Sequence, residues 1–178
     1  MSSVRQNRQG QRPVPSAVLG AMWLASTPRF PEPTIRAHWR EGRCAEVPVG
    51  DTFDVIRVLN QRLGQTALED LRRNEVPVGP VLLNRPRRAV EFLIPFVRGL
   101  EWDIRDTERI TRRPEEALPR VKMPIPGPLT VDGRSWLVAP DGGQILTTPA
   151  HLATAIRRAR RTLRDAPAVA GRHLSPIT

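Results

Sequence analysis

A strand, an amphipathic helix and a second strand follow one another in the middle of the chain. Residues 53–58, Phe-Asp-Val-Ile-Arg-Val, are rich in β-branched side chains and roughly alternate, as is typical of a strand, and residues 78–83 have the same character. Between them, leucine and alanine recur at helical spacing, which predicts a helix over residues 60–73. A strand, helix and strand in this order favour a right-handed parallel crossover, and therefore a sheet covered by helices.

Similar patterns predict the other elements. We expect helices over residues 16–25, 34–40 and from 148 or 149 to 164, and strands over residues 89–94 and 135–139. Residues 98–130 are dense in proline and in mixed charge, so we expect a long irregular connection there. The predicted fold class is therefore α+β, with a mixed sheet flanked by helices and a basic amphipathic helix near the C-terminus.

The formal net charge of +10 is concentrated at the two ends of the chain. Residues 1–16 hold three arginines and no acid, and residues 149–178 hold six arginines against one aspartate. The residues between them carry a net charge of only +2. The first stretch has almost nothing to bury, which predicts a disordered basic arm over residues 1–16. We expect the folded domain to cover residues 17–165 and a flexible tail to cover residues 166–178.

The usage of a few residue types excludes several kinds of site. Cys44 is the one cysteine, so neither an internal disulfide nor a zinc site with two thiolates can form. Lys122 is the one lysine and does not follow a glycine-rich loop, which excludes a Walker A motif. The three histidines lack metal-ligand spacing. We therefore expect no metal and no cofactor.

The apolar run at residues 17–25 bears on where the protein resides. It is far shorter than the ~20 apolar residues that cross a bilayer, so we expect no membrane partner. A basic stretch followed by an apolar run also resembles a secretory signal, but this run contains Gly20 and lacks a small-residue cleavage site. The favoured interpretation is a cytoplasmic protein, with its oligomeric state left open.

Five short motifs occur in an order that is found in a known family. They are Trp-Leu-Ala-Ser at 23–26, Phe-Asp-Val-Ile-Arg-Val at 53–58, Val-Gly-Pro-Val-Leu at 78–82, Arg-Arg-Ala-Val-Glu-Phe-Leu-Ile-Pro at 87–95 and Trp-Leu-Val-Ala-Pro at 136–140. Over about residues 17–160 the chain resembles the bifunctional DNA primase/polymerase, or prim-pol, domain of high-GC actinomycetes. The resemblance implies an α+β fold whose strands present metal-binding acids and a nucleotide-binding histidine.

The catalytic residues that the resemblance implies are missing from this chain. Active members carry two acids, two residues apart, on the first strand, where they hold the metal ions of nucleotidyl transfer. The matching positions here are Arg57 and Leu59, and Asp54 has the opposite parity on the strand. The histidine position is Val90, or Glu91 if the register slips by one, and the nearest acid for a third motif is Asp132 in a turn. The resemblance is therefore to a pseudoenzyme, and no catalytic residue is assigned.

Two groups of arginines are the candidate nucleic-acid-binding residues, because the planar guanidinium binds phosphate oxygens well. One group precedes the strand at 89–94 and the other lies on the polar side of the C-terminal helix. The residues are Arg85, Arg87, Arg88, Arg157, Arg158, Arg161 and Arg164. The alternative for both groups is that they are simply solvated. The four tryptophans offer a stacking surface in one interpretation and core anchors in the favoured one.

Three functions fit these observations. The first is a non-catalytic prim-pol-like module that binds nucleic acid, or a nucleotide in the relict cleft, through arginine-rich surfaces. The second is a protein-interaction or assembly module on the same scaffold, with a protein partner. The third is an active DNA primase or polymerase, which the missing acids disfavour. We expect them in that order.

Overall fold

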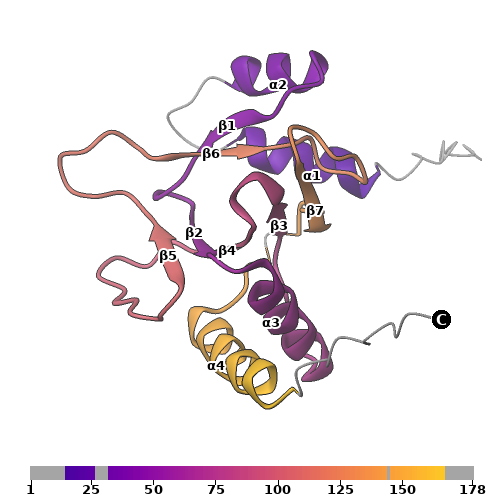
Figure 1. Ribbon diagram of the computed structural model, residues 1–178. Helices are drawn as coiled ribbons and strands as arrows, with labels where there is room; N and C mark the ends of the chain where they lie inside the picture. Colours follow the sequence, from indigo (N-terminus) through magenta and orange to yellow (C-terminus); the bar gives the residue numbers. More distant parts are fainter. Residues whose placement is uncertain (1–14, 27–31, 144, 167–178) are drawn as a thin grey trace, which may run out of the picture.

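The computed structural model of the protein describes residues 15–26, 32–143 and 145–166 (Figure 1). The predicted arm and tail lie almost wholly outside these described residues. The elements, in chain order, are α1 (Ser16–Ala25), α2 (Glu32–Arg40), β1 (Ala45–Pro48), β2 (Phe53–Val58), α3 (Gln61–Arg73), β3 (Val81–Asn84), the 3-10 turn η1 (Arg85–Arg87), β4 (Ala89–Pro95), β5 (Thr107–Ile110), β6 (Arg120–Met123), β7 (Arg134–Val138) and α4 (Pro149–Asp165).

The main sheet has five strands in the order β5-β2-β4-β3-β7. Both β2 and β3 pair antiparallel with β4, so they run parallel to each other, as the predicted crossover through α3 requires. They are not neighbours, because β4 folds back after η1 and pairs with both. Every hydrogen-bonded strand pair among the described residues is antiparallel, so the predicted mixed sheet is wrong.

The predicted irregular connection over residues 98–130 is also wrong in part. It contains two four-residue strands, β5 at the edge of the main sheet and β6, which pairs with β1 in a separate two-stranded sheet. Both strands have only four residues, and two of the four are charged in each, so neither has the mostly apolar sequence of β4. Their partners lie far away in the sequence, and local composition does not show such pairing.

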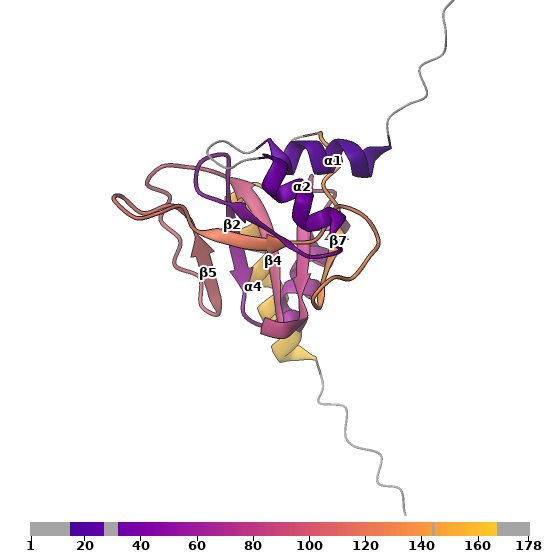
Figure 2. The ribbon, with the colours of Figure 1, turned by 90° about the horizontal axis from the view of Figure 1, so that it is seen from above.

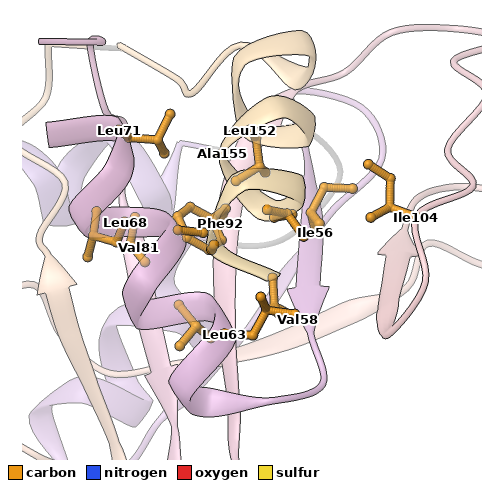
Figure 3. Close-up of a cluster of buried hydrophobic side chains, with 14 of the residues drawn as sticks. Ile56, Val58, Leu63, Leu68, Leu71, Val81, Phe92, Ile104, Leu152 and Ala155 are labelled. Carbon is orange, nitrogen blue, oxygen red and sulfur yellow. The ribbon is translucent and has the colours of Figure 1, made fainter. Parts of the chain in front are cut away.

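The main sheet is covered by different elements on its two faces (Figures 1 and 2). Helices α3 and α4 pack together on one face, where Ile56, Phe92 and Leu152 belong to a buried apolar cluster (Figure 3). Helices α1 and α2 and the β1–β6 sheet cover the other face, where the core includes Phe53 and Leu93. Because side chains alternate along a strand, each central strand contributes to both cores.

Helices α3 and α4 each pack one apolar side against the main sheet. Asn60 begins α3, because its side-chain oxygen accepts a hydrogen bond from the Leu63 amide at 3.0 Å. Gly64 lies so close to Val90 of β4 that a Cβ would be 2.5 Å from the valine Cβ, so the first turn of α3 is in direct contact with the sheet.

No helix in the described residues is both long and apolar enough to span a membrane.

Candidate functional site

A buried group of charged side chains lies where the prim-pol resemblance places catalytic residues. Glu91 of β4 is fully buried and accepts hydrogen bonds from Arg57 Nε and Asn84 Nδ2, both at 2.8 Å. Arg134 Nη1 of β7 is 3.4 Å from the other oxygen of the same carboxylate. Arg57 also donates through Nη1 to Glu108 of β5 at 2.9 Å. We call Arg57, Asn84, Glu91, Glu108 and Arg134 the buried ion cluster.

The strand register produces the buried ion cluster. Arg57 is directly opposite Glu91 on one side of β2 and directly opposite Glu108 on the other. These residues alternate with Ile56 and Val58, which face α3 and α4, so the cluster faces α1 and the β1–β6 sheet. Arg134 Nη1 also donates to the Lys122 carbonyl at 3.2 Å, which links the main sheet to β6. Two cations and two carboxylates thereby satisfy one another across neighbouring strands.

This arrangement leaves no place for a catalytic metal pair at the positions that the resemblance implies. Arg57 is a cation that already contacts two carboxylates, and Leu59 lies beyond the end of β2 with 50% of its surface exposed. The described residues contain no group of three or more histidine, cysteine, aspartate or glutamate side chains that could hold a metal ion. The site is therefore a salt-bridge network of two cations and two carboxylates that are already paired with one another.

Asp54 lies on the opposite face of β2, which confirms the parity predicted for it. Its carboxylate accepts hydrogen bonds from Arg109 Nε at 2.9 Å and Nη2 at 2.6 Å. Arg109 Nη2 also donates to the Val97 carbonyl at 2.8 Å, and Nη1 donates to the Leu100 carbonyl. Asp54 therefore anchors the connection between β4 and β5 and is not directed toward the buried ion cluster.

The residues at the implied histidine position and at the third acid position form contacts that hold the fold together. Val90 is buried in the core beneath α3, whereas Glu91 forms the centre of the buried ion cluster. Asp132 adopts a left-handed backbone conformation, with φ of 50°, in the turn before β7. Its carboxylate accepts a hydrogen bond from the Cys44 amide at 3.4 Å. Asp132 thus joins the segment before β1 to the turn between β6 and β7.

Cys44 is buried beside this turn, and its Sγ donates to the Val131 carbonyl at 3.4 Å. Burial, together with the nearby Asp132 carboxylate, raises the pKa of the Cys44 thiol from 9.0 to about 11. The thiolate is the nucleophile in cysteine chemistry, so a thiol protonated throughout the neutral range is a poor one. Cys44 is therefore a packing residue here.

The two arginine groups predicted from the sequence occupy different elements. Arg85, Arg87 and Arg88 are exposed in and just after η1, the hairpin between β3 and β4. Arg157, Arg161 and Arg164 are exposed on α4, on the side away from Leu152, Ala155, Ile156 and Ala159, which are buried. Arg158 differs, because its Nη1 is 3.8 Å from the Asp70 carboxylate of α3. We call Arg157, Arg161 and Arg164 the arginine stripe.

Three further arginines near these groups were not predicted as site residues. Arg62 is exposed in the first turn of α3, and Arg105 is exposed next to Asp106. Arg160 is 3.6 Å from Asp106 and also donates to the Arg105 carbonyl. The exposed position of Arg62 on an amphipathic helix was visible in the sequence. The proximity of Arg105 to α4 was not, because 55 residues separate the two partners.

The tryptophans are anchors, as the favoured interpretation predicted. Trp39 is buried and donates to the Met123 carbonyl at 3.0 Å, and Trp136 donates to the Pro124 carbonyl at 3.1 Å. Trp23 stacks on Phe53, with ring centroids 5.4 Å apart. Trp102 is half-buried and donates to Thr107 Oγ1 at 2.8 Å. None of the four therefore offers a fully exposed ring on which a base could stack.

Comparison with known proteins adds no relative to this description. No family model matches the chain, and neither the curated proteins nor the solved structures contain a significant match. The resemblance to the prim-pol family therefore stays a prediction, and functional conclusions depend on the side chains themselves.

The buried ion cluster makes a first prediction. In Glu91→Gln, both Arg57 and Arg134 remain buried without their shared counter-charge. We expect the free energy of unfolding to fall by about 3 kcal/mol, because removing one partner leaves an uncompensated buried charge. Urea denaturation monitored by circular dichroism measures this change.

Glu108→Gln is the matched control, since its carboxylate contacts the same Arg57 but is 51% exposed. We expect it to lose less than about 1 kcal/mol. Equal losses in the two variants would contradict the central role of Glu91.

The raised pKa of Cys44 makes a second prediction. At pH 8 the folded protein should react with iodoacetamide at least about a hundredfold more slowly than the same protein in urea, because two pKa units reduce the thiolate fraction by that factor. The native rate should rise with pH up to about 11. Labelling at pH 8 that is as fast in the native state as in urea would show that the thiol is accessible and ionised.

Proposed function

We propose that the protein is a non-catalytic module that binds nucleic acid through the phosphate backbone, with the arginine stripe of α4 as its main contact. The observation that carries this proposal is that Arg157, Arg161 and Arg164 are exposed together and form no ion pair with any described residue. Unpaired guanidinium groups on one face are the groups that phosphates bind best.

The spacing of the arginine stripe suits a nucleic-acid strand. Positions four and seven residues apart lie on one side of a helix. At 1.5 Å per residue, the three arginines span about 10 Å along α4. The phosphates of one strand of a duplex are about 3.4 Å apart along the axis, so the stripe covers about three nucleotides. Contacts to phosphates read no bases, and we therefore expect binding without sequence preference.

Many other arginines in the described chain are already neutralised, which distinguishes the stripe from a general excess of charge. Arg57 and Arg134 are buried against Glu91, and Arg109 is paired with Asp54. At the surface, Arg43 is paired with Glu41 and Arg113 with Glu116. A phosphate must displace a carboxylate to bind any of these, whereas the stripe is free to bind directly.

A connected series of contacts links the C-terminal half of α4 to the η1 arginines, so that both lie at the same end of the domain. Arg160 of α4 contacts the Arg105–Asp106 segment, and the Asp106 carbonyl accepts a hydrogen bond from the Leu59 amide. Leu59 directly precedes Asn60, the residue that begins α3. The first turn of α3 contacts β4 close to η1. Arg62, Arg85, Arg87, Arg88 and Arg105 therefore extend the basic surface around this end.

The buried ion cluster argues against the alternative ligand, a single nucleotide in the relict cleft. A nucleotide phosphate that bound Arg57 or Arg134 would have to replace Glu91, whose side chain is fully buried. The displaced carboxylate would then remain in the core without its cations, which costs several kcal/mol. A polynucleotide on the outer surface requires no such rearrangement.

A third prediction tests the proposed binding. The protein should bind each of two DNA duplexes of unrelated sequence. The logarithm of the binding constant should fall with the logarithm of the salt concentration with a slope of roughly −3, since each phosphate contact releases about 0.9 counterion. Arg157→Ala, Arg161→Ala and Arg164→Ala together should reduce this slope toward zero without changing the melting temperature. A fluorescence-anisotropy titration at several salt concentrations measures the slope.

The matched control removes the same charge elsewhere. Arg43→Ala, Arg98→Ala and Arg113→Ala change three exposed arginines outside α4 and η1. This variant should bind with nearly the slope of the wild type. If the wild-type chain fails to bind DNA and RNA at low salt, or if both triple variants lose binding equally, the stripe is not a nucleic-acid site.

A fourth prediction concerns the absence of catalysis. With Mg²⁺ or Mn²⁺ we expect no template-dependent nucleotide incorporation, because Arg57 and Leu59 stand where two metal-binding acids are needed. A primer-extension assay with labelled nucleotides measures this. Primer synthesis that disappears in Asp54→Ala would contradict the proposal and support an active polymerase.

A further inference from the structure

Helices α1 and α2 lie on the face of the main sheet opposite α4 (Figure 1). An apolar groove lies between these two helices. It encloses about 690 Å³. Val18 and Met22 of α1 line one side, Trp39 of α2 lines the other, and Ile125 contributes from the segment after β6. The groove is open to solvent at a place where a small domain normally presents polar residues.

Helix α1 is unusual for a surface helix because it contains no charged residue. Only Gly20, Leu24 and Ala25 are buried, while Val18, Leu19 and Met22 are 46%, 41% and 50% exposed. A surface helix that packs only on its own domain has one apolar side and one polar side. The second apolar side of α1, which also lines the groove, indicates that something covers it.

The rim of the groove carries charges of both signs. Glu32 begins α2 and Arg40 ends it, and Arg36 lies between them as an i,i+4 partner of Glu32. In a two-fold arrangement whose axis is perpendicular to α2, the two copies of α2 run antiparallel. The Glu32 end of one copy then faces the Arg40 end of the other, so the rim is complementary to itself.

We infer that the groove binds a second copy of this chain, so that the protein forms a two-fold dimer through α1. The same helix supplies both the protruding Val18 and Met22 side chains and one wall of the groove, which is what an isologous interface requires. The chain's own residues 1–14 are a poorer occupant, because they contain three arginines and no acid and would meet Arg36 and Arg40.

Such a dimer has a consequence for the arrangement of its surfaces. The groove and the arginine stripe lie on opposite sides of the main sheet (Figure 1). Two copies joined through α1 would direct their stripes away from each other. If the proposed nucleic-acid binding holds, the dimer can bridge two segments of nucleic acid, whereas dimer formation itself does not rest on that function.

Sedimentation velocity of the full chain, from about 1 to about 300 μM, tests the inference. We expect a reversible monomer–dimer equilibrium with a dissociation constant in the micromolar range, because the apolar patch is small. Met22→Glu should keep the protein monomeric throughout this range. Leu59→Glu, which changes an equally exposed residue on the other side of the molecule, should dimerise like the wild type.

A charge exchange tests the two-fold geometry independently. Glu32→Arg alone and Arg40→Glu alone should each weaken dimerisation about tenfold, since two symmetry-related pairs become repulsive. The double variant Glu32→Arg, Arg40→Glu should restore dimerisation, which loss of fold in either single variant would not do. Circular dichroism shows that each variant remains folded.

Three outcomes would overturn the inference. They are a wild-type protein that stays monomeric at 300 μM, a Met22→Glu variant that dimerises like the wild type, and a double charge exchange that restores nothing. Binding of a fluorescent amphipathic peptide with acidic flanks by a monomeric wild type would assign the groove to a different partner. Nucleic-acid binding by the stripe is measured separately, so its failure leaves the dimer untouched.

Discussion

The rest of the structure depends on the hydrogen bonds and ion pairs that the buried carboxylate of Glu91 forms. It sits in the middle strand of the main sheet and binds Arg57 of β2, Asn84 of β3 and Arg134 of β7. Arg57 extends the network to Glu108 of β5, and Arg134 extends it to the backbone of β6. A buried carboxylate is tolerated only when it is paired and hydrogen-bonded, so this network defines which strands must be neighbours.

The same network shows how the chain's own cations accommodate a buried carboxylate in the sheet. The prim-pol resemblance implies metal-binding acids at two positions where this chain has Arg57 and Leu59. Arg57 is buried, whereas Leu59 is exposed. Two carboxylates close together without a metal repel each other. Arg57 between Glu91 and Glu108 removes that repulsion and needs no ion. The charged side chains of this network neutralise one another without a bound ion.

The two faces of the sheet present different surfaces to the surroundings. On one side, α4 buries small and branched apolar residues against α3 and leaves arginines outside. On the other side, α1 leaves apolar residues outside and has no charge at all. A cationic face favours polyanions, whereas an apolar face favours another protein surface. The fold therefore places the arginine side chains of α4 and the exposed apolar side chains of α1 on opposite sides of the main sheet.

The sequence by itself determined the elements whose signals are local. The helix over residues 60–73 and the strand over residues 53–58 agree with α3 and β2, because their apolar spacing and the Asn60 cap act over a few residues. The helix over residues 16–25 agrees with α1, which is an almost wholly apolar run. The opposite parity of Asp54 and Arg57 also follows from strand geometry alone. The exposed arginines of α4 were identifiable in the same way, since a helix has only one buried side.

Only the tertiary structure decided how these elements pair and which charges remain free. The insertion of β4 between β2 and β3, the short strands β5 and β6, and the partners of Arg57 and Arg134 all depend on contacts between residues far apart in the chain. Composition does not distinguish Arg109, which is held by Asp54, from Arg161, which forms no ion pair with another residue that the structure describes. The difference arises because a charge is neutralised by whatever the fold places within about 4 Å of it, and that distance is set by long-range packing.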